Sequence, residues 1–279
     1  MKKKTQGAPA PNYVKWLWYA ALTPFVLLAA MLTLTALGAF GRMPSFEELE
    51  NPRSNIATEI YSEDGKVLGT FFVQNRSYVQ YEELFASDSV TRTSINGREV
   101  PPIVAALIAT EDARFDSHSG IDIPSLIRVG VKTILLQNRS AGGGSTITQQ
   151  LAKNEFFSQE QVVERKVAEV FMAFDIERAL DKDRILELYV NSIYFGEGLY
   201  GIGPACQGYL GKAPSAMNDW ESTLLAGVPN APSVYAPTQN YDLACQRQAQ
   251  VLEHMVKHCA ITQEEANAIA VQANESPWA

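Results

Sequence analysis

The sequence predicts a mainly α-helical protein that is preceded by one transmembrane helix and a short β-containing stalk. Three observations lead to this fold class. No charged residue occurs between positions 16 and 40, two β-prone runs flank an Asp64-Gly65 pair, and helical signals dominate from Pro101 onward. Hydrophobic residues make up 46% of the chain and charged residues 19%, a mixture that is sufficient to build a buried core.

The uncharged run at residues 16–40 is long enough to cross a bilayer. At about 1.5 Å of rise per residue, a helix of this length spans the roughly 30 Å of hydrocarbon with some tilt. A cleaved signal peptide is the alternative, but its apolar core usually has only about 7–15 residues. We therefore expect a transmembrane helix over residues 16–41.

Charges on either side of this run indicate its orientation. The basic residues before it are Lys2, Lys3, Lys4 and Lys15, and the acidic residues after it include Glu47, Glu48 and Glu50. Because basic flanks stay inside the cell, residues 1–15 are expected to form a cytoplasmic tail. The rest of the chain is then expected on the periplasmic or extracellular side of the cytoplasmic (inner) membrane.

Residues 42–100 are predicted to form a stalk that joins the membrane helix to the next domain. Two β-prone runs, at 58–61 and 67–73, flank the Asp64-Gly65 pair. An Asp-Gly pair between such runs is typical of a hairpin turn. An irregular linker is the alternative for this segment.

A helical domain is predicted over residues 101–260. Pro102 precedes an apolar run at 103–109, as expected of proline at the start of a helix. Further helical patterns cover residues 158–180, 183–194, 217–227 and 243–258. Thr262 and Glu265 then fit a capping box, which predicts a C-terminal helix and tail over residues 261–279.

The formal net charge of the chain is −8. Proteins that bind nucleic acid need clustered basic residues to meet the phosphates. We therefore exclude nucleic acid as the main partner, and the basic residues have to be judged by where they cluster.

A first candidate motif lies at residues 110–120, where an apolar helix ends in paired carboxylates. Glu111 and Asp112 are followed by Phe115, His118 and Gly120. A carboxylate that is partly shielded from water is suited to general-base chemistry near neutral pH. A solvated helix end with a capping histidine is the simpler interpretation of this motif when it stands alone.

A glycine run that leads into a helix forms the second candidate motif, at residues 142–154. Backbone N–H groups at the helix start, hydroxyl groups and Lys153 together predict a cradle for a phosphate-bearing ligand. A nucleotide-binding P-loop is disfavoured, because Gly144 is followed by Ser145 and Thr146 and not by the required lysine. An ordinary turn is the alternative.

Glu169 is the third candidate, because it lies among apolar residues within the helical stretch 164–176. A carboxylate in such surroundings is either paired or functional. Pairing with Arg165 at i,i+4 would be a surface ion pair that contributes a few tenths of a kcal/mol, so both interpretations stay open.

Taken in order, these three motifs resemble those of glycosyltransferase family 51, the glycan-polymerising domain of class A penicillin-binding proteins and of monofunctional peptidoglycan transglycosylases. Residues 182–201 and 225–237 are similar to the fourth and fifth blocks of the family. Five ordered blocks are far more specific than any one of them. Two departures are Val228, where the family often has leucine, and Gln246, where the family has the first residue of an arginine pair.

The resemblance implies a lysozyme-like catalytic lobe and a small, membrane-associated jaw lobe at about residues 121–141. Arg128, Lys132 and Arg139 lie among apolar residues in this segment. Such a basic amphipathic stretch can lie at the membrane interface. An ordinary core helix is the alternative.

The activity implied by the resemblance is polymerisation of lipid II, with inversion and release of polyprenyl pyrophosphate. The substrates would be lipid II and the growing lipid-linked glycan chain, and the other partners would be membrane lipids and cell-wall synthesis proteins. Glu111 would be the general base, and Glu169 would assist at the pyrophosphate. Lys153, Arg165 and Lys166 would balance the growing negative charge of the leaving group.

The other residues carried over from the family's blocks would bind substrate. They are Asp112, Phe115, His118, Gly144, Ser145, Thr146, Gln149, Gln150, Asn154 and Asn191. The chemistry needs no cofactor, although a divalent cation, Mg²⁺ or Mn²⁺, is compatible with the pyrophosphate. The sequence assigns no metal ligand. The family also binds the phosphoglycolipid moenomycin at the donor position.

Two other functions stay open on the sequence alone. A lytic transglycosylase would use a glutamate to protonate the leaving sugar oxygen, but it would not need the basic set Lys153, Arg165 and Lys166. A non-enzymatic cell-wall scaffold would tolerate the loss of Glu111. No serine in the chain has a lysine three residues later, the pair expected of a transpeptidase. We therefore expect either a monofunctional enzyme or a piece of a bifunctional one.

Overall fold

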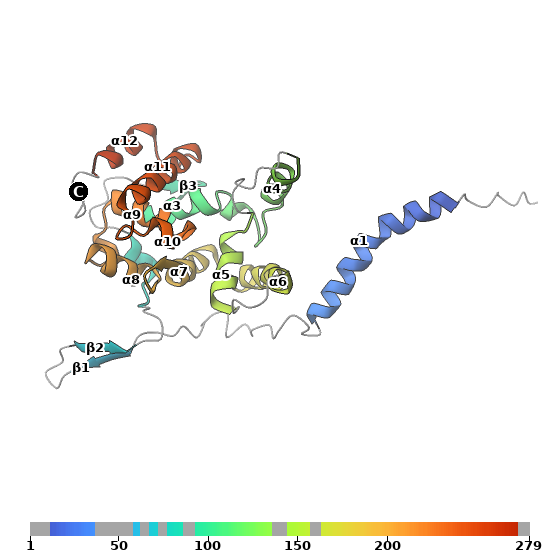
Figure 1. The fold of residues 1–279 in the computed structure, drawn as a ribbon, viewed down its shortest axis with the longest axis horizontal. Coiled ribbons are helices and arrows are strands. Elements are labelled where there is room, and N and C mark those ends of the chain that lie inside the picture. Colours follow the sequence, from blue (N-terminus) through green and yellow to red (C-terminus); the bar gives the residue numbers. More distant parts are fainter. Residues whose placement is uncertain are drawn as a thin grey trace, which may run out of the picture.

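The computed structural model describes residues 12–36, 58–61, 67–71, 77–85, 93–135, 144–156 and 163–272. Most of these residues form a body of packed helices. Helix α1 (Asn12–Ala36) and the hairpin of β1 (Thr58–Tyr61) and β2 (Val67–Phe71) lie outside this body (Figure 1). The predicted mainly α-helical fold is confirmed, since the strands in the described parts form only short two-stranded hairpins.

Helix α1 covers most of the predicted transmembrane segment. Its described side chains are largely exposed, for example Trp16 at 72% and Phe25 at 69%. The hydroxyls of Thr23 and Thr33 donate to backbone carbonyls one turn earlier, at 2.7 and 2.8 Å, so neither is left unpaired. Across the described residues, no helix combines the length and the apolar character needed to cross a membrane. The span over residues 16–41 therefore stays a prediction.

The predicted hairpin of the stalk is confirmed, because β1 and β2 pair in antiparallel fashion. The register shifts between Ile60 and Tyr61, as it does at a β-bulge. The Asp64-Gly65 turn and residues 72–73, the predicted end of the second strand, lie outside the described residues.

The end of the predicted stalk belongs to the helical body. The 3₁₀ helix η1 (Tyr81–Leu84) lies against α7, and the hairpin of β3 (Ser94–Ile95) and β4 (Arg98–Glu99) lies against α3. Leu84 and Ile95 are each only 1% exposed and are part of the hydrophobic core. The prediction of a stalk that reaches residue 100 is therefore wrong, because this stretch supplies apolar side chains to the core.

Helix α3 (Pro102–Glu111) is the centre of that core. Every side chain from Pro102 to Ala109 is buried, as expected of a helix that is apolar on all sides. It packs against α9 (Asp219–Gly227) and α11 (Tyr241–Lys257), which also pack against each other. Because α3 is enclosed in this way, the position of its last residue is fixed by the core.

A second group of helices lies beside the end of α3 (Figure 1). Within it, α5 (Ile147–Phe156) packs against both α6 (Val163–Ala179) and α7 (Lys182–Ser192). Helix α7 begins after Asp181, whose side chain accepts a hydrogen bond of 2.8 Å from the backbone N–H of Arg184. An aspartate is among the preferred residues at this capping position.

Short elements complete the body. They are β5 (Tyr194–Gly196), β6 (Leu199–Tyr200), α8 (Ile202–Ala205), the π helix η3 (Cys206–Leu210), the 3₁₀ helices η4 (Pro214–Ala216) and η5 (Val228–Asn230), α10 (Pro232–Tyr235) and α12 (Gln263–Val271). The predicted capping box at the start of α12 is confirmed, because Thr262 and Glu265 each bind the other's backbone N–H.

Helix α4 (Ile123–Leu135) covers most of the predicted jaw segment. Ile123, Leu126 and Ile127 are 63%, 44% and 61% exposed. The alternative of an ordinary core helix is therefore wrong for this part of α4. Residues 136–141 of the predicted jaw lie outside the described residues.

Candidate active site

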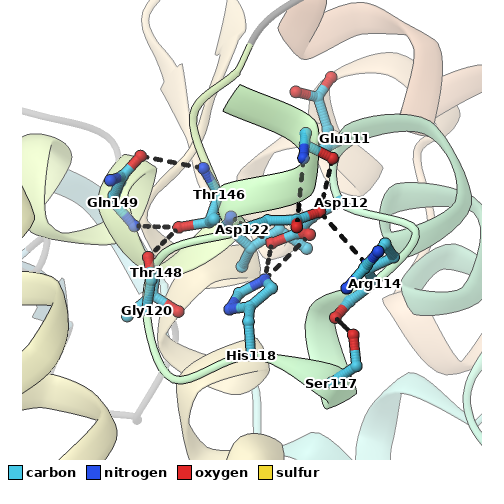
Figure 2. A network of polar contacts seen from close by, with 12 residues as sticks. Glu111, Asp112, Arg114, Ser117, His118, Gly120, Asp122, Thr146, Thr148 and Gln149 are labelled. Carbon is cyan, nitrogen blue, oxygen red and sulfur yellow. Dashed lines mark hydrogen bonds and ion pairs between the residues drawn. The ribbon is translucent and has the colours of Figure 1, made fainter. Parts of the chain in front are cut away.

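Glu111 is the last residue of α3 and is half-buried. Its Oε2 accepts a hydrogen bond of 3.0 Å from Nε2 of Gln150 on α5. The next residue, Asp112, ends the helix, and the two neighbouring carboxylates point in opposite directions (Figure 2). A buried apolar helix thus presents a partly exposed carboxylate that is oriented by an amide donor. A general base needs this combination of access and fixed direction.

Asp112 and His118 form a buried pair behind Glu111. Their side chains are 4% and 5% exposed, and His118 Nε2 lies 2.9 and 3.1 Å from the two carboxylate oxygens. Asp112 Oδ2 also accepts a hydrogen bond of 3.0 Å from the backbone N–H of Ile147. Phe115 is fully buried against the His118 ring. These side chains tie the loop after α3 to the start of α5, and their predicted role in substrate binding stays a prediction.

Thr146 and Gln149 form a capping box at the start of α5 (Figure 2). The backbone N–H of each donates to the other's side-chain oxygen at 3.2 Å, and the Thr146 hydroxyl donates to the Gly120 carbonyl at 2.7 Å. The N–H of Ile147 is bound to Asp112 as described above. These N–H groups thus have protein acceptors in the structure, and the predicted phosphate cradle stays a prediction. Thr146 and Gln149 cap the helix, and their predicted contact with substrate stays a prediction.

A lysine of α7 braces the same loop. Lys182 Nζ donates to the His118 carbonyl at 2.8 Å and lies 4.1 Å from the centre of the Phe115 ring. It also pairs with Glu177 of α6 at 2.7 Å. Glu177 in turn accepts a hydrogen bond of 2.6 Å from the Thr148 hydroxyl on α5. The loop, α5, α6 and α7 thus meet at one largely buried ion pair, which the sequence motifs do not indicate.

Lys166 links the second glutamate to the glycine-rich segment. Its Nζ lies 2.8 Å from Glu169 Oε2 and 2.8 Å from Ser145 Oγ. Glu169 is only 2% exposed, whereas the Lys166 side chain is 52% exposed. An ion pair with so exposed a cation adds little stability, but it holds the ammonium group in place. The side chain of Arg165, the predicted partner of Glu169, lies outside the described part of the chain.

The stretch 145–150 connects the two glutamates. Ser145 at one end contacts Lys166, the partner of Glu169, and Gln150 at the other end contacts Glu111. The structure therefore brings the first and third motifs together at the second. The other predicted ligands in this region are the half-buried Gly144 and Asn154 and the exposed Lys153.

Asn191 makes three hydrogen bonds within the protein. Its amide donates to the carbonyls of Val79 and Glu187, both at 2.8 Å, and its side-chain oxygen accepts from the N–H of Val79 at 2.9 Å. The residue is 9% exposed. Asn191 fastens the segment around Val79 to α7, and its predicted role in substrate binding stays a prediction.

Tyr189 on α7 is a further residue of the site that the sequence does not single out. It is fully buried, and its hydroxyl donates to Gln150 Oε1 at 3.2 Å. Burial, reinforced by the negative charges of Glu111 and Asp112, raises the pKa of Tyr189, so the phenol keeps its proton. A buried tyrosine hydroxyl needs a partner. Because this partner lies 39 residues away along the chain, no local sequence pattern indicates it.

Within the described residues, no three His, Cys, Asp or Glu side chains gather as metal ligands. A cation on a pyrophosphate takes many of its ligands from phosphate oxygens and water. A dependence on Mg²⁺ or Mn²⁺ therefore stays a prediction, and no residue is assigned to a cation.

Similar sequences are found among known proteins. The family model described as Transglycosylase matches residues 73–256. Penicillin-binding protein 1A of Pseudomonas aeruginosa is 37% identical over 249 residues, which are 88% of this chain and 28% of that protein. Proteins of the same name from Escherichia coli and Aquifex aeolicus are 35% and 37% identical, over 89% and 81% of this chain and 28% and 29% of theirs. The chain thus spans less than a third of the length of these relatives.

Among solved structures, penicillin-binding protein 1A from Haemophilus influenzae matches 77% of this chain and 20% of its own. The TM-score is 0.40 and the sequence identity is 22%.

Proposed function

Since this chain belongs to the transglycosylase family, we propose that it is a peptidoglycan glycosyltransferase that polymerises lipid II into glycan strands. The observation that carries the proposal is the half-buried Glu111, which ends a buried helix and is oriented by Gln150. At the other end of the stretch 145–150, Lys166 presents an exposed cation that is held by Glu169. A base and a cation are the two groups that this transfer needs.

In the proposed reaction, the 4-hydroxyl of an acceptor lipid II attacks the anomeric carbon of the donor glycan chain. Glu111 takes the hydroxyl proton while the new C–O bond forms. The bond to the pyrophosphate breaks with inversion, and its electron pair leaves on the polyprenyl pyrophosphate. Because negative charge grows on that group toward the transition state, a cation there stabilises the transition state more than the ground state.

Lys166 is the proposed cation at the leaving group, and Glu169 acts by holding it. We further propose that Lys153 and Arg165 help to balance the negative charge of the leaving group. Gly144, Ser145 and Asn154 are proposed to meet sugar or phosphate oxygens, since these residues of the second motif are not fully buried.

A single-pass anchor in the cytoplasmic membrane, with the catalytic domain outside, is part of the proposal. It rests on the uncharged residues 16–40 and on the exposed apolar side chains of α1. Helix α4 adds exposed Ile123 and Ile127 beside the exposed Arg128. A helix with this character can lie in the membrane interface, where it would meet the proposed partners, namely membrane lipids, lipid II and the growing glycan chain. Cell-wall synthesis proteins are further proposed partners.

Cleavage of glycan by a lytic transglycosylase is less well supported. That reaction needs an acid at a neutral sugar oxygen and has no use for a cation at the leaving group. The position of Lys166 between Ser145 and Glu169 therefore favours a pyrophosphate leaving group.

Incubation of the purified chain with labelled lipid II in vesicles tests the proposal. Polymeric glycan and free polyprenyl pyrophosphate are the expected products. Hydrolysed monomer without polymer would contradict the proposal. The absence of any turnover by folded protein would favour a scaffold.

A further inference from the structure

The nitrogen and the oxygen of the Gln150 side-chain amide each form a hydrogen bond. Nε2 donates to Glu111 Oε2 at 3.0 Å, and Oε1 accepts from the Tyr189 hydroxyl at 3.2 Å. The three residues come from α3, α5 and α7. A chain of two hydrogen bonds therefore leads from a fully buried phenol to the partly exposed carboxylate.

The direction of this chain follows from the chemistry of its members. A glutamine amide can rotate by half a turn about its last bond, which exchanges its oxygen and nitrogen. The protonated Tyr189 hydroxyl donates its hydrogen bond to the amide oxygen and so favours one orientation. In the other orientation, Oε1 would face the Glu111 carboxylate and two acceptors would repel each other.

We propose that Tyr189 is a positioning residue for Glu111 and that it acts through the amide of Gln150. The inference rests on the proposed function, in which Glu111 takes the acceptor proton. With Oε2 held by Gln150, the other carboxylate oxygen is directed to the acceptor hydroxyl. Fixed geometry of this kind raises the rate of the chemical step, because the base does not have to be oriented in each turnover.

The test replaces Tyr189 with phenylalanine, which keeps the buried ring and removes only the hydroxyl. Because one neutral hydrogen bond is lost, kcat for lipid II polymerisation is expected to fall by about 3- to 10-fold. KM is expected to change little, because Tyr189 does not touch substrate. Tyr209→Phe is the matched control, since Tyr209 is 5% exposed and its hydroxyl donates to the Phe195 carbonyl at 2.9 Å. This variant loses a comparable hydrogen bond and should keep the wild-type kcat.

A double-mutant cycle with Gln150→Ala separates positioning from a general loss of stability. Once the amide is absent, Tyr189→Phe should reduce kcat no further, so the two effects should not add. Additive effects would overturn the proposal that Tyr189 positions Glu111 through Gln150. A wild-type kcat for Tyr189→Phe in an otherwise active protein would overturn it as well. A wild-type chain that forms no polymer would instead overturn the proposed function, and with it the role of Tyr189.

Discussion

The two glutamates of the site stand in opposite surroundings. Glu111 is half-buried at the end of α3, and its carboxylate is held by a neutral amide. Glu169 is 2% exposed within α6, and it contacts Lys166, whose side chain is 52% exposed. In the first region the carboxylate is the accessible group. In the second region the accessible group is the cation, and the carboxylate is what holds it.

The contacts around the two glutamates also differ in how far they are buried. Behind Glu111, the buried pair of Asp112 and His118 and the brace of Lys182 join the loop to three helices. At Glu169, the described contact is a lysine that reaches across to Ser145. Under the proposed function the two carboxylates serve different steps, because Glu111 takes a proton and Glu169 holds a cation. Variants at the two glutamates and at their partners test this division.

The largest effect is expected at Glu111. Glu111→Gln keeps the size of the side chain and a hydrogen-bonding oxygen but cannot take the acceptor proton. Lipid II polymerisation should therefore fall by about 10²- to 10⁴-fold, the range for a lost general base. Initial rates and a thermal melt of each protein measure this. A folded variant with a near wild-type rate would end the assignment of Glu111 as the base.

A smaller effect is expected on the Glu169 side. Lys166→Ala removes the cation itself and should lower kcat by about 10- to 100-fold. Glu169→Gln keeps the cation but loosens its position, so its effect should be smaller than that of Lys166→Ala. In the Lys166→Ala background, Glu169→Gln should add little to the loss. If Glu169→Gln lowers kcat as much as Glu111→Gln does, while Lys166→Ala leaves kcat unchanged, the proposed division of roles is wrong.

Local patterns predicted the parts of the fold that local forces decide. The apolar run after Pro102 predicts α3, the Asp64-Gly65 pair predicts the β1–β2 hairpin, and Thr262 with Glu265 predicts the cap of α12. Each of these signals lies within a few residues of the structure that it forms. Glu111 and Glu169 are predictable in the same way, because each is a carboxylate beside an apolar stretch of the sequence.

Contacts between residues that are distant in the sequence could not be predicted in this way. The glycine run predicts free N–H groups at the start of α5, whereas the N–H of Ile147 donates to Asp112, which is 35 residues away. The amide of Asn191 donates to the carbonyl of Val79, which is 112 residues away, and no local pattern predicts this contact. The hydrogen bond from Tyr189 to Gln150, which is 39 residues away, is a further contact of this kind. Periodicity and spacing report which face of an element is buried, but they do not report what meets that face.

The brace behind Glu111 can be weakened without touching the carboxylate. Lys182→Met leaves Glu177, which is 6% exposed, without its cation. Because an uncompensated charge then stays largely buried, the free energy of unfolding should fall by about 2–3 kcal/mol. The rate per folded molecule should also fall, since the loop that follows Glu111 loses its anchor. Denaturant titration and initial rates of the same preparations measure the two effects.

The matched control for this variant is Lys212→Met. Lys212 pairs with Glu221 at 2.8 Å, and the glutamate is 4% exposed. The pair lies at the start of α9, and neither residue contributes to the contacts around Glu111. We expect lower stability but an unchanged rate per folded molecule. Equal loss of rate in both variants would show that the brace acts only through global stability.

The smallest effect is expected at Asp122, where the loop passes into α4. Its carboxylate caps the helix by accepting from the N–H of Ser125 at 3.3 Å, and it lies 3.6 Å from Arg114. Asp122→Ala removes the cap and should lower the free energy of unfolding by about 1 kcal/mol. Asp122→Asn keeps a capping oxygen and should cost less at neutral pH. Thermal melts at neutral pH compare the two variants.

The pH dependence of these melts separates the effect of the negative charge of Asp122 from that of its capping hydrogen bond. Burial alone raises the pKa of Asp122, but the hydrogen bonds from Ser125 and the nearby Arg114 and His118 outweigh it, so the pKa is lowered overall. A carboxylate whose pKa is lowered by folding stabilises the folded protein. This stabilisation is fully present above the pKa of the unfolded chain, about 4, and is lost as the pH falls through the pKa of the folded protein. The difference between wild type and Asp122→Asn should therefore be constant near neutral pH and shrink below about pH 4. A difference that grows on acidification would contradict a stabilised Asp122 carboxylate.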